Sequence, residues 1–181
     1  MRITGGSLRG RRVEVPGGVI RPAMDRMRES VFAILGDLSE KSFLDLFTGS
    51  GIIALEAASR GAKSVEAVEM DRQKREILLK NAALSPVRIR CRFMSAELYI
   101  KRAKQPFDII FCDPPFPYKF KNELLSSIAF SPLMSENSLL VIHYPGEESL
   151  NIPENLSKKD SRAFGRSKID FFSKIWRKPL E

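Results

Sequence analysis

The ten residues from Phe107 to Phe116 constrain the fold of this chain more than any other stretch. An apolar run rich in β-branched and aromatic side chains, Phe107-Asp108-Ile109-Ile110-Phe111-Cys112, ends abruptly at Asp113-Pro114-Pro115. Such a composition is typical of a central strand in a parallel sheet. Because two prolines cannot continue a hydrogen-bonded ladder, the chain must leave the sheet at Asp113. The Asp113 carboxylate is therefore predicted at the C-terminal end of a buried strand, where open α/β sheets bind their ligands.

Asp113-Pro114-Pro115-Phe116 resembles the (Asp/Asn)-Pro-Pro-(Phe/Tyr/Trp) motif of methyltransferases that alkylate planar exocyclic amines with S-adenosylmethionine. In such an amine the nitrogen lone pair is delocalised into the ring. If Asp113 and the Pro114 carbonyl each accept one N–H, the lone pair can be aimed at a sulfonium methyl group. Phe116 would stack on the base, a contact worth roughly 1 to 3 kcal/mol. The alternative is that Asp-Pro-Pro is only a turn that ends the strand.

A second motif indicates a nucleotide-containing cofactor. Residues 43–47 are predicted to form a buried strand, and Thr48-Gly49-Ser50-Gly51 opens a helix that runs to about Arg60. Gly49-x-Gly51-x-x-Ala54, with Glu69 at the end of the next predicted strand (64–69), fits the dinucleotide-binding fingerprint. A nicotinamide-dependent dehydrogenase is therefore one alternative, and tight helix–strand packing without a ligand is another. Asp45 favours a methyltransferase, whose sheets use such an acid on the amino group of the methionine moiety.

The rest of the chain alternates helical and strand periodicities. These patterns predict helices at about 25–36, 71–83, 96–103 and 124–130, and strands at 87–93, 107–112, 139–144, 161–164 and 169–176. With 181 residues and 43% hydrophobic content, we expect one α/β domain over residues 1–181. No apolar stretch is long enough to span a bilayer. No apolar run follows Arg2, the first charged residue, as it would in a secretory signal peptide. We therefore expect a cytoplasmic protein without a membrane partner.

Charge favours a polyanionic partner. Thirty Lys and Arg residues against 22 Asp and Glu give a net charge of +8. Residues 1–20 are interpreted as a basic arm built on a short β-hairpin, whose guanidinium groups would grip phosphates and unpaired bases. The candidate RNA-binding residues are Arg9, Arg11, Arg12, Arg21, Arg26 and, in the loop after the Pro-Pro turn, Lys119. A solvated basic surface is the alternative, and Arg88, Arg90 and Arg92 on strand 87–93 have the same two interpretations.

The remaining reactive residue types indicate no further chemistry. Cys91 and Cys112 lie far apart in apolar surroundings, so they are interpreted as reduced core residues, and no metal site is expected. His143 is the only histidine and lies at a predicted strand end. No acid, base or ligand lies near it in the sequence, so it is interpreted as a structural residue.

Taken together, the motifs cover nearly the whole chain and resemble the RsmD family of bacterial methyltransferases. The matching stretches are Ile3-Thr4-Gly5-Gly6-x-x-Arg9-Gly10-Arg11, Arg21-Pro22-x-x-Asp25-Arg26-x-Arg28-Glu29-x-x-Phe32, Leu44-Asp45-Leu46-Phe47-x-Gly49-Ser50-Gly51, Glu69-Met70-Asp71 and Asp113-Pro114-Pro115-Phe116. Two positions depart from the family pattern. Ala23-Met24 replaces hydroxyl residues before Asp25, which puts the helix cap in question, and Ile142 replaces an acid before His143.

The resemblance implies a Rossmann-like class I methyltransferase fold: a mostly parallel sheet, a C-terminal antiparallel hairpin and a short N-terminal β-hairpin arm. It implies methyl transfer from S-adenosyl-L-methionine to guanine N2 in 16S rRNA, within the small ribosomal subunit or its assembly intermediate, by a monomer. The implied catalytic residues are Asp113, Pro114 and Phe116. The implied cofactor-binding residues are Asp45, Thr48, Gly49, Gly51, Glu69, Met70, Ser95, Ala96 and Asp113.

Three other functions stay open from the sequence. A DNA or RNA adenine-N6 methyltransferase shares the Asp-Pro-Pro-Phe motif, although this chain has no evident target-recognition domain. A nicotinamide oxidoreductase would need a proton-relay residue and gives no reason for Asp113-Pro114-Pro115-Phe116. A non-catalytic RNA-binding module would have no use for Asp45 and Glu69 around a glycine turn.

Overall fold

The computed structural model describes residues 1–15 and 22–175. Contacts divide the chain into two compact units, Met1–Ala96 and Glu97–Glu181, each with its own strands and helices. Arg21, the end of the predicted arm at 16–20 and the end of the last predicted strand at Trp176 lie outside the described residues. The expectation of a single domain stays a prediction.

The first unit is built on three parallel strands in the order β3-β2-β1. The strands are β1 (Ser42–Leu46), β2 (Ser64–Val68) and β3 (Ile89–Arg92). The helices are α1 (Pro22–Leu35), α2 (Ile52–Ser59) and α3 (Arg75–Ala82), and α3 follows a single 3₁₀ turn, Arg72–Lys74. In register, Leu46 pairs with Val68 and Val68 with Arg92, so the C-terminal ends of these strands lie at one edge.

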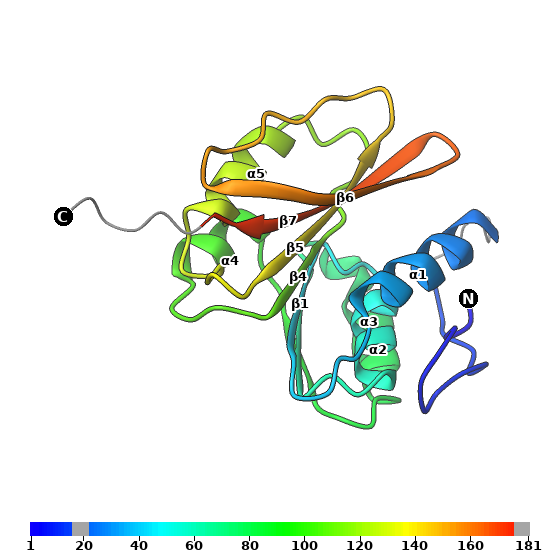
Figure 1. Cartoon of the computed structure of the whole chain (residues 1–181). Coiled ribbons are helices and arrows are strands. Elements are labelled where there is room, and N and C mark those ends of the chain that lie inside the picture. The colour runs from blue at the N-terminus through cyan, green and yellow to red at the C-terminus, as the bar shows by residue number, and fades with distance from the viewer. Residues whose placement is uncertain (16–21, 176–181) are drawn as a thin grey trace. The chain divides into compact units, whose positions relative to one another are not determined.

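Helix α2 forms the core of this unit. Figure 1 shows α2 beside α3, and α2 packs on both β1 and β2. Every residue from Ile53 to Ser59 is buried, because alanines and aliphatic side chains occupy all sides of the helix. Glu56 is the one charged residue in this helix, and its side chain is completely buried.

The second unit contains four strands in the order β4-β5-β7-β6. Its elements are α4 (Ala96–Arg102), β4 (Ile109–Cys112), α5 (Lys121–Ala129), β5 (Leu139–Pro145), β6 (Leu156–Phe164) and β7 (Ser167–Lys174). β4 and β5 are parallel, whereas β7 is antiparallel to both β5 and β6. β4 is fully buried, as its apolar sequence predicts.

The strands therefore confirm the expected mixture: mostly parallel pairing, with a C-terminal antiparallel hairpin. That hairpin, seen in orange and red in Figure 1, is longer than the sequence predicted, because polar residues of β6 pair along the buried β7. Helix α1 begins at Pro22 rather than at Asp25, since proline fits the first turn of a helix. Residues 1–15 double back with one antiparallel bridge, Arg2 to Arg12, and form no regular strand.

Among the described helices, none has the length and apolar character needed to cross a membrane.

Candidate active site and cofactor site

The glycine turn after β1 adopts a conformation that its sequence requires. Gly49 and Gly51 have φ of 60° and 82°, in the left-handed region that glycine occupies without strain. A Cβ atom on Gly51 would lie 2.7 Å from Leu78 Cδ1, so the turn also packs too closely for a side chain. The backbone N–H of Thr48 donates to the Val68 carbonyl at 3.0 Å, which ties the turn to the end of β2. The turn is a backbone loop held at the C-terminal edge of the sheet.

Asp45 supports this turn from below. Its side chain is 1% exposed, and Oδ2 accepts hydrogen bonds from the Thr48 hydroxyl and from the Ala54 N–H at 3.1 Å. The carboxylate thus joins strand β1, the turn and the first turn of α2. It also places a negative charge beneath the glycines.

Glu69 holds the same turn from the neighbouring strand. Its Oε2 accepts the Gly49 N–H at 2.8 Å, and its Oε1 accepts the Asp71 N–H at 2.8 Å. Lys74 Nζ lies 3.8 Å from Oε2. A carboxylate has about four lone-pair positions, so two remain for ribose hydroxyls.

The surroundings of Glu69 fit the adenosine half of a nucleotide cofactor. Met70 is an apolar side chain that is 67% exposed directly beside this acid, as a surface for a planar base would be. Ser95 is half-buried and Ala96 is buried, both after β3, which pairs with β2. All the predicted cofactor residues except Asp113 lie in the first unit, at the ends of its strands and in the loops that follow.

In the second unit the motif leaves the sheet at Asp113, as predicted. Asp113 is half-buried, Pro114 is buried, and Pro115 and Phe116 are exposed. Phe116 is 41% exposed, so much of its ring is available to a ligand.

His143 pairs with an acid of the motif, so the expectation that no acid lies near it was wrong. Its Nδ1 lies 2.8 Å from Asp113 Oδ1, and its ring packs edge-on against Phe116 at a centroid distance of 5.4 Å. The parallel register explains this pairing, because Cys112 lies opposite Ile142 and the next residue of each strand is Asp113 or His143. The side chain is buried, and its Nε2 has no hydrogen-bond partner within the described residues. Strand β5 therefore places His143 beside Asp113, even though Ile142 departs from the family pattern.

The loop after the motif is held by Lys121. This lysine is only 3% exposed, and its Nζ donates to the carbonyls of Phe116 at 2.8 Å and Tyr118 at 2.6 Å. It also pairs with Glu148 Oε1 at 3.0 Å. The buried ammonium group therefore satisfies its three donors on the loop and on one acid.

Two aromatic side chains extend this loop. The Tyr118 hydroxyl donates to Glu97, and both burial and this acid raise the pKa of Tyr118, which keeps the hydroxyl protonated. Its ring packs edge-on against Phe120 at 5.9 Å, and Phe120 is 60% exposed. Lys119 between them is exposed, as an RNA-contacting residue must be.

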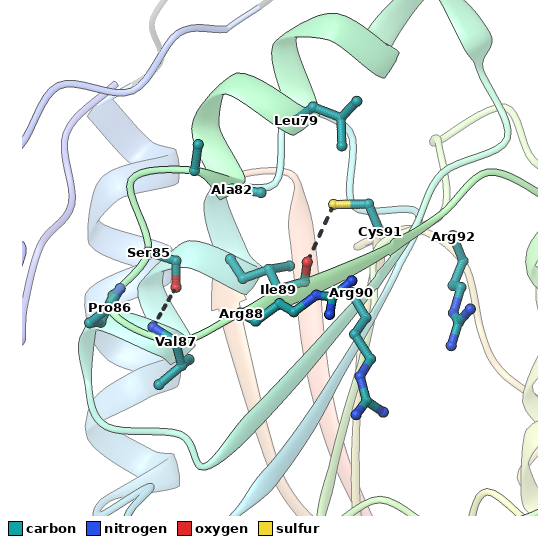
Figure 2. Close-up of a pocket in the computed structure, with 11 residues that line it drawn as sticks. Leu79, Ala82, Ser85, Pro86, Val87, Arg88, Ile89, Arg90, Cys91 and Arg92 are labelled. Carbon is teal, nitrogen blue, oxygen red and sulfur yellow. Dashed lines mark hydrogen bonds between the residues drawn. The ribbon is translucent and has the colours of Figure 1, made fainter.

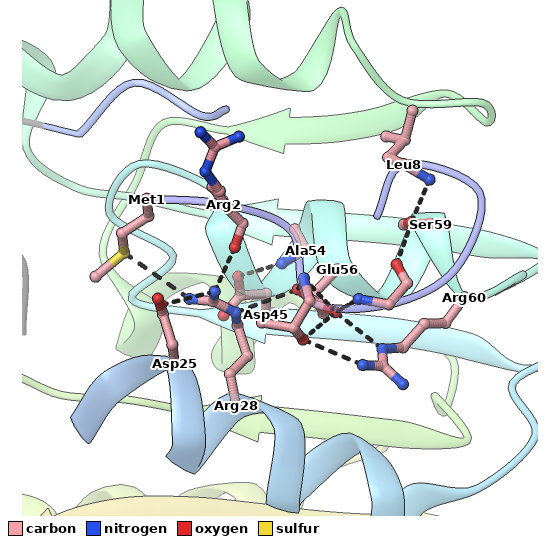
Figure 3. Close-up of polar contacts among 12 residues, drawn as sticks. Met1, Arg2, Leu8, Asp25, Arg28, Asp45, Ala54, Glu56, Ser59 and Arg60 are labelled. Carbon is pink, nitrogen blue, oxygen red and sulfur yellow. Dashed lines mark hydrogen bonds and ion pairs between the residues drawn. The ribbon is translucent and has the colours of Figure 1, made fainter. Parts of the chain in front are cut away.

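The N-terminal segment is fixed on the first unit by Glu56 (Figure 3). Glu56 Oε1 accepts the Gly5 N–H at 2.8 Å and the Thr4 hydroxyl at 2.7 Å, and Oε2 accepts the Thr4 N–H at 2.9 Å. Arg60 and Arg28 both pair with this carboxylate through Nε, at 2.9 and 3.2 Å. The predicted arm is thus docked on α2 through its backbone.

Arg28 belongs to this network and not to an exposed basic surface. It is 1% exposed, and it donates to the Arg2 carbonyl at 2.6 Å and to Asp25 at 2.9 Å. Its guanidinium group therefore stabilises the fold of the first unit. The remaining candidates in the described region, Arg9, Arg11, Arg12 and Arg26, are exposed.

Sequence reasoning missed His143, Lys121 and Glu56. Glu56 could have been found from the sequence, because it is a charged residue in the middle of the apolar helix IIALEAAS. His143 could have been found only from strand register, and Lys121 resembles any surface lysine in sequence. The free thiols match their interpretation: Cys112 is buried and Cys91 half-buried, and burial raises the pKa of the Cys91 thiol. In the described part of the chain, no three His, Cys, Asp or Glu side chains are grouped to hold a metal ion.

Comparison with known proteins identifies the class of protein. The solved structure of yhhF from Escherichia coli matches with a TM-score of 0.87 and 31% identity, over 98% of this chain and 99% of that chain. The Escherichia coli (strain K12) protein named "Ribosomal RNA small subunit methyltransferase D" is 32% identical over 170 residues, or 92% of this chain and 86% of the relative. A Haemophilus influenzae protein of the same name is 31% identical over 86% of this chain and 84% of the relative. The fold and the motifs are those of a Rossmann-like, S-adenosylmethionine-dependent methyltransferase.

The family follows from the same comparisons. Residues 1–173 match the family described as "Conserved hypothetical protein 95". The chain belongs to this family, which is the RsmD family that the motifs indicated.

Proposed function

We propose that this protein transfers a methyl group from S-adenosyl-L-methionine to the exocyclic N2 of a guanine in 16S rRNA. The substrate would be the small ribosomal subunit or an assembly intermediate in the cytoplasm, and the enzyme would act as a monomer. The observation that carries the proposal is Asp113, placed at the end of buried strand β4 and hydrogen-bonded to His143 at 2.8 Å. The names of the relatives support rRNA of the small subunit as the substrate class.

The cofactor would be held by residues of the first unit. Glu69 would accept the ribose hydroxyls, Met70 would cover the adenine, and Ser95 and Ala96 would line its edge. The backbone of Thr48, Gly49 and Gly51 would approach the methionine moiety, with the charge of Asp45 attracting its amino group. When bound, the cofactor supplies an electrophilic methyl group on a sulfonium ion.

The residues of the motif would prepare the guanine amine. Asp113 would accept one N2–H and the Pro114 carbonyl the other, which draws the lone pair out of the ring plane. His143 would act as a positioning residue: donation from Nδ1 to Oδ1 leaves Oδ2 of Asp113 to face the amine. As the bond between N2 and the methyl carbon formed, the bond between that carbon and the sulfonium sulfur would break and leave a neutral thioether. N2 would then lose one proton, which Asp113 would accept. Phe116 would stack on the extruded base.

The test is single-turnover methylation of unmodified small subunits, with mass analysis of the nucleosides. We expect N2-methylguanosine as the product. Asp113→Ala should lower the rate on the order of 100-fold or more, because catalysis here depends on alignment. Asp160→Ala, the same substitution at a surface ion pair on β6, serves as the control and should keep the wild-type rate.

Other products would redirect or overturn the proposal. N6-methyladenosine would assign the same chemistry to adenine. Calorimetric binding of a nicotinamide dinucleotide but not of S-adenosylmethionine would exclude methyl transfer. A wild-type rate for folded Asp113→Ala would remove Asp113 from the mechanism.

A further inference from the structure

A groove lies between helix α3 and strand β3, outside the residues assigned to methyl transfer. Its volume is about 680 Å³, large enough for one nucleotide. Leu79 of α3 and Val87 and Ile89 of the β3 segment form its apolar wall. Leu79 is 44% exposed, which leaves apolar surface for a ligand.

Arginines lie on the face of the strand opposite to this apolar wall. Figure 2 shows Arg88, Arg90 and Arg92 extending from the strand on the side away from Leu79. Period-2 alternation explains the arrangement, because successive side chains of a strand point to opposite faces. β3 is the end strand of its sheet and pairs only with β2 among the described strands. A chain lying across this edge would contact the apolar wall on one side and guanidinium groups on the other.

The ion pairs separate these arginines into two kinds. Arg92 pairs with Glu66 of β2, so its charge is already compensated. Arg88 and Arg90 are exposed and have no carboxylate partner within residues 1–15 and 22–175. No acidic residue lines the groove. Two uncompensated guanidinium groups beside an apolar wall favour a ligand that is anionic and also carries a flat apolar surface.

We propose that this groove is a second RNA-binding site, which takes an unpaired nucleotide of the substrate RNA. The base would lie against Leu79 and Val87, and the flanking phosphates would contact Arg88 and Arg90. This inference rests on the proposed rRNA substrate. The site adds affinity away from the methylated base, because phosphate contacts position an RNA without reading its sequence.

The experiment measures the affinity of the full-length protein for a fluorescent 16S rRNA fragment by anisotropy, over a series of salt concentrations. The variant Arg88→Gln/Arg90→Gln removes two phosphate contacts. With a slope of roughly 0.7 per contact for single strands, the salt dependence should fall by about 1.4. If the two proteins bind equally at 1 M salt, that change corresponds to a loss of roughly 25-fold in affinity at about 0.1 M salt.

Two further variants keep the test specific. Lys101→Gln/Arg102→Gln removes the same charge from the exposed end of α4 and should leave the salt slope unchanged. Leu79→Gln should weaken RNA binding without changing the slope, because it removes apolar contact and no charge. Affinity for S-adenosylmethionine should be the same in all variants.

Equal affinities and slopes for the arginine variant and its control would overturn the inference. Unchanged RNA binding together with lost binding of an extended peptide would assign the groove to a protein strand instead, and would also overturn it. If wild type and control fail to methylate small subunits while RNA binding still depends on Arg88 and Arg90, the proposed function fails and this site stands.

Discussion

Two irregular segments, residues 1–15 and residues 114–120, are each held by one buried charged side chain, and the two charges are opposite. Glu56 receives backbone N–H groups of the N-terminal segment, whereas Lys121 donates to backbone carbonyls of the loop after Asp113. In both segments the buried side chain forms hydrogen bonds with main-chain groups that have no partner in a strand or helix.

The difference lies in how far each anchor reaches along the chain. Glu56 is 52 and 51 residues from Thr4 and Gly5, so its bonds exist only in the folded protein. Lys121 is 5 and 3 residues from its two carbonyl partners, so it stabilises a local turn of the chain. We infer that Glu56 contributes mainly to global stability, and that Lys121 contributes mainly to the shape of the proposed substrate loop.

The N-terminal segment is also packed more closely than the loop after Asp113. A Cβ atom on Gly6 would lie 1.9 Å from the Ser59 carbonyl oxygen, and the Ser7 N–H donates to that oxygen at 2.7 Å. The N-terminal segment is therefore in direct backbone contact with the end of α2. The loop after Asp113 instead leaves Phe116 and Phe120 exposed.

Glu56→Ala should give the largest change in stability. Removing this carboxylate leaves Arg28 buried without its partner on α2, and such losses cost about 3 to 5 kcal/mol. Urea denaturation followed by circular dichroism measures the free energy of unfolding. Glu14→Ala is the matched control, because it removes an exposed ion pair with Lys80 from the same segment and should cost far less. If both variants lowered the free energy of unfolding by the same small amount, Glu56 would not be the anchor of global stability inferred above.

Lys121→Met should have an intermediate effect on stability and a clear effect on activity. Two loop carbonyls lose their donor, which costs about 1 to 3 kcal/mol. Because the loop carries Phe116, we expect the KM for small subunits to rise more than kcat falls. Lys119→Met, the same substitution at an exposed position of the loop, should leave the free energy of unfolding unchanged.

A rescue variant distinguishes a positioning role from a purely structural one. Lys121→Arg keeps the positive charge and its donors, so it should recover most of the KM loss. If Lys121→Met lowered stability while KM stayed at the wild-type value, the loop would not depend on its anchor.

Replacing Arg9, Arg11 and Arg12 with Gln should have the smallest effect on stability, because all three side chains are exposed. We expect weaker RNA binding with a salt slope reduced by roughly 2, at about 0.7 per lost contact, and unchanged cofactor affinity. Anisotropy and calorimetry measure the two affinities. An unchanged RNA affinity at low salt would show that the docked segment presents only a solvated surface.

The sequence by itself determined the order of the elements, the approximate positions of most strands and the motifs that indicate the family. Apolar runs, glycine turns and prolines act locally. Spacing alone could therefore place Asp45 within a buried strand, and Gly49, Glu69 and Asp113 where strands have ended. The Asp-Pro-Pro-Phe motif led to the prediction of amine chemistry, because each of its residue types would have a separate physical task. Family membership followed from several such motifs together.

Only the tertiary structure decided which polar residues meet. His143 pairs with Asp113 because β4 and β5 are parallel with Cys112 opposite Ile142, and register is a property of the sheet, not of either strand. Arg28 is buried because Glu56, 28 residues away, compensates its charge. Spacing along the chain carries no information about such long-range partners, since burying a charge becomes favourable only where folding supplies the opposite one.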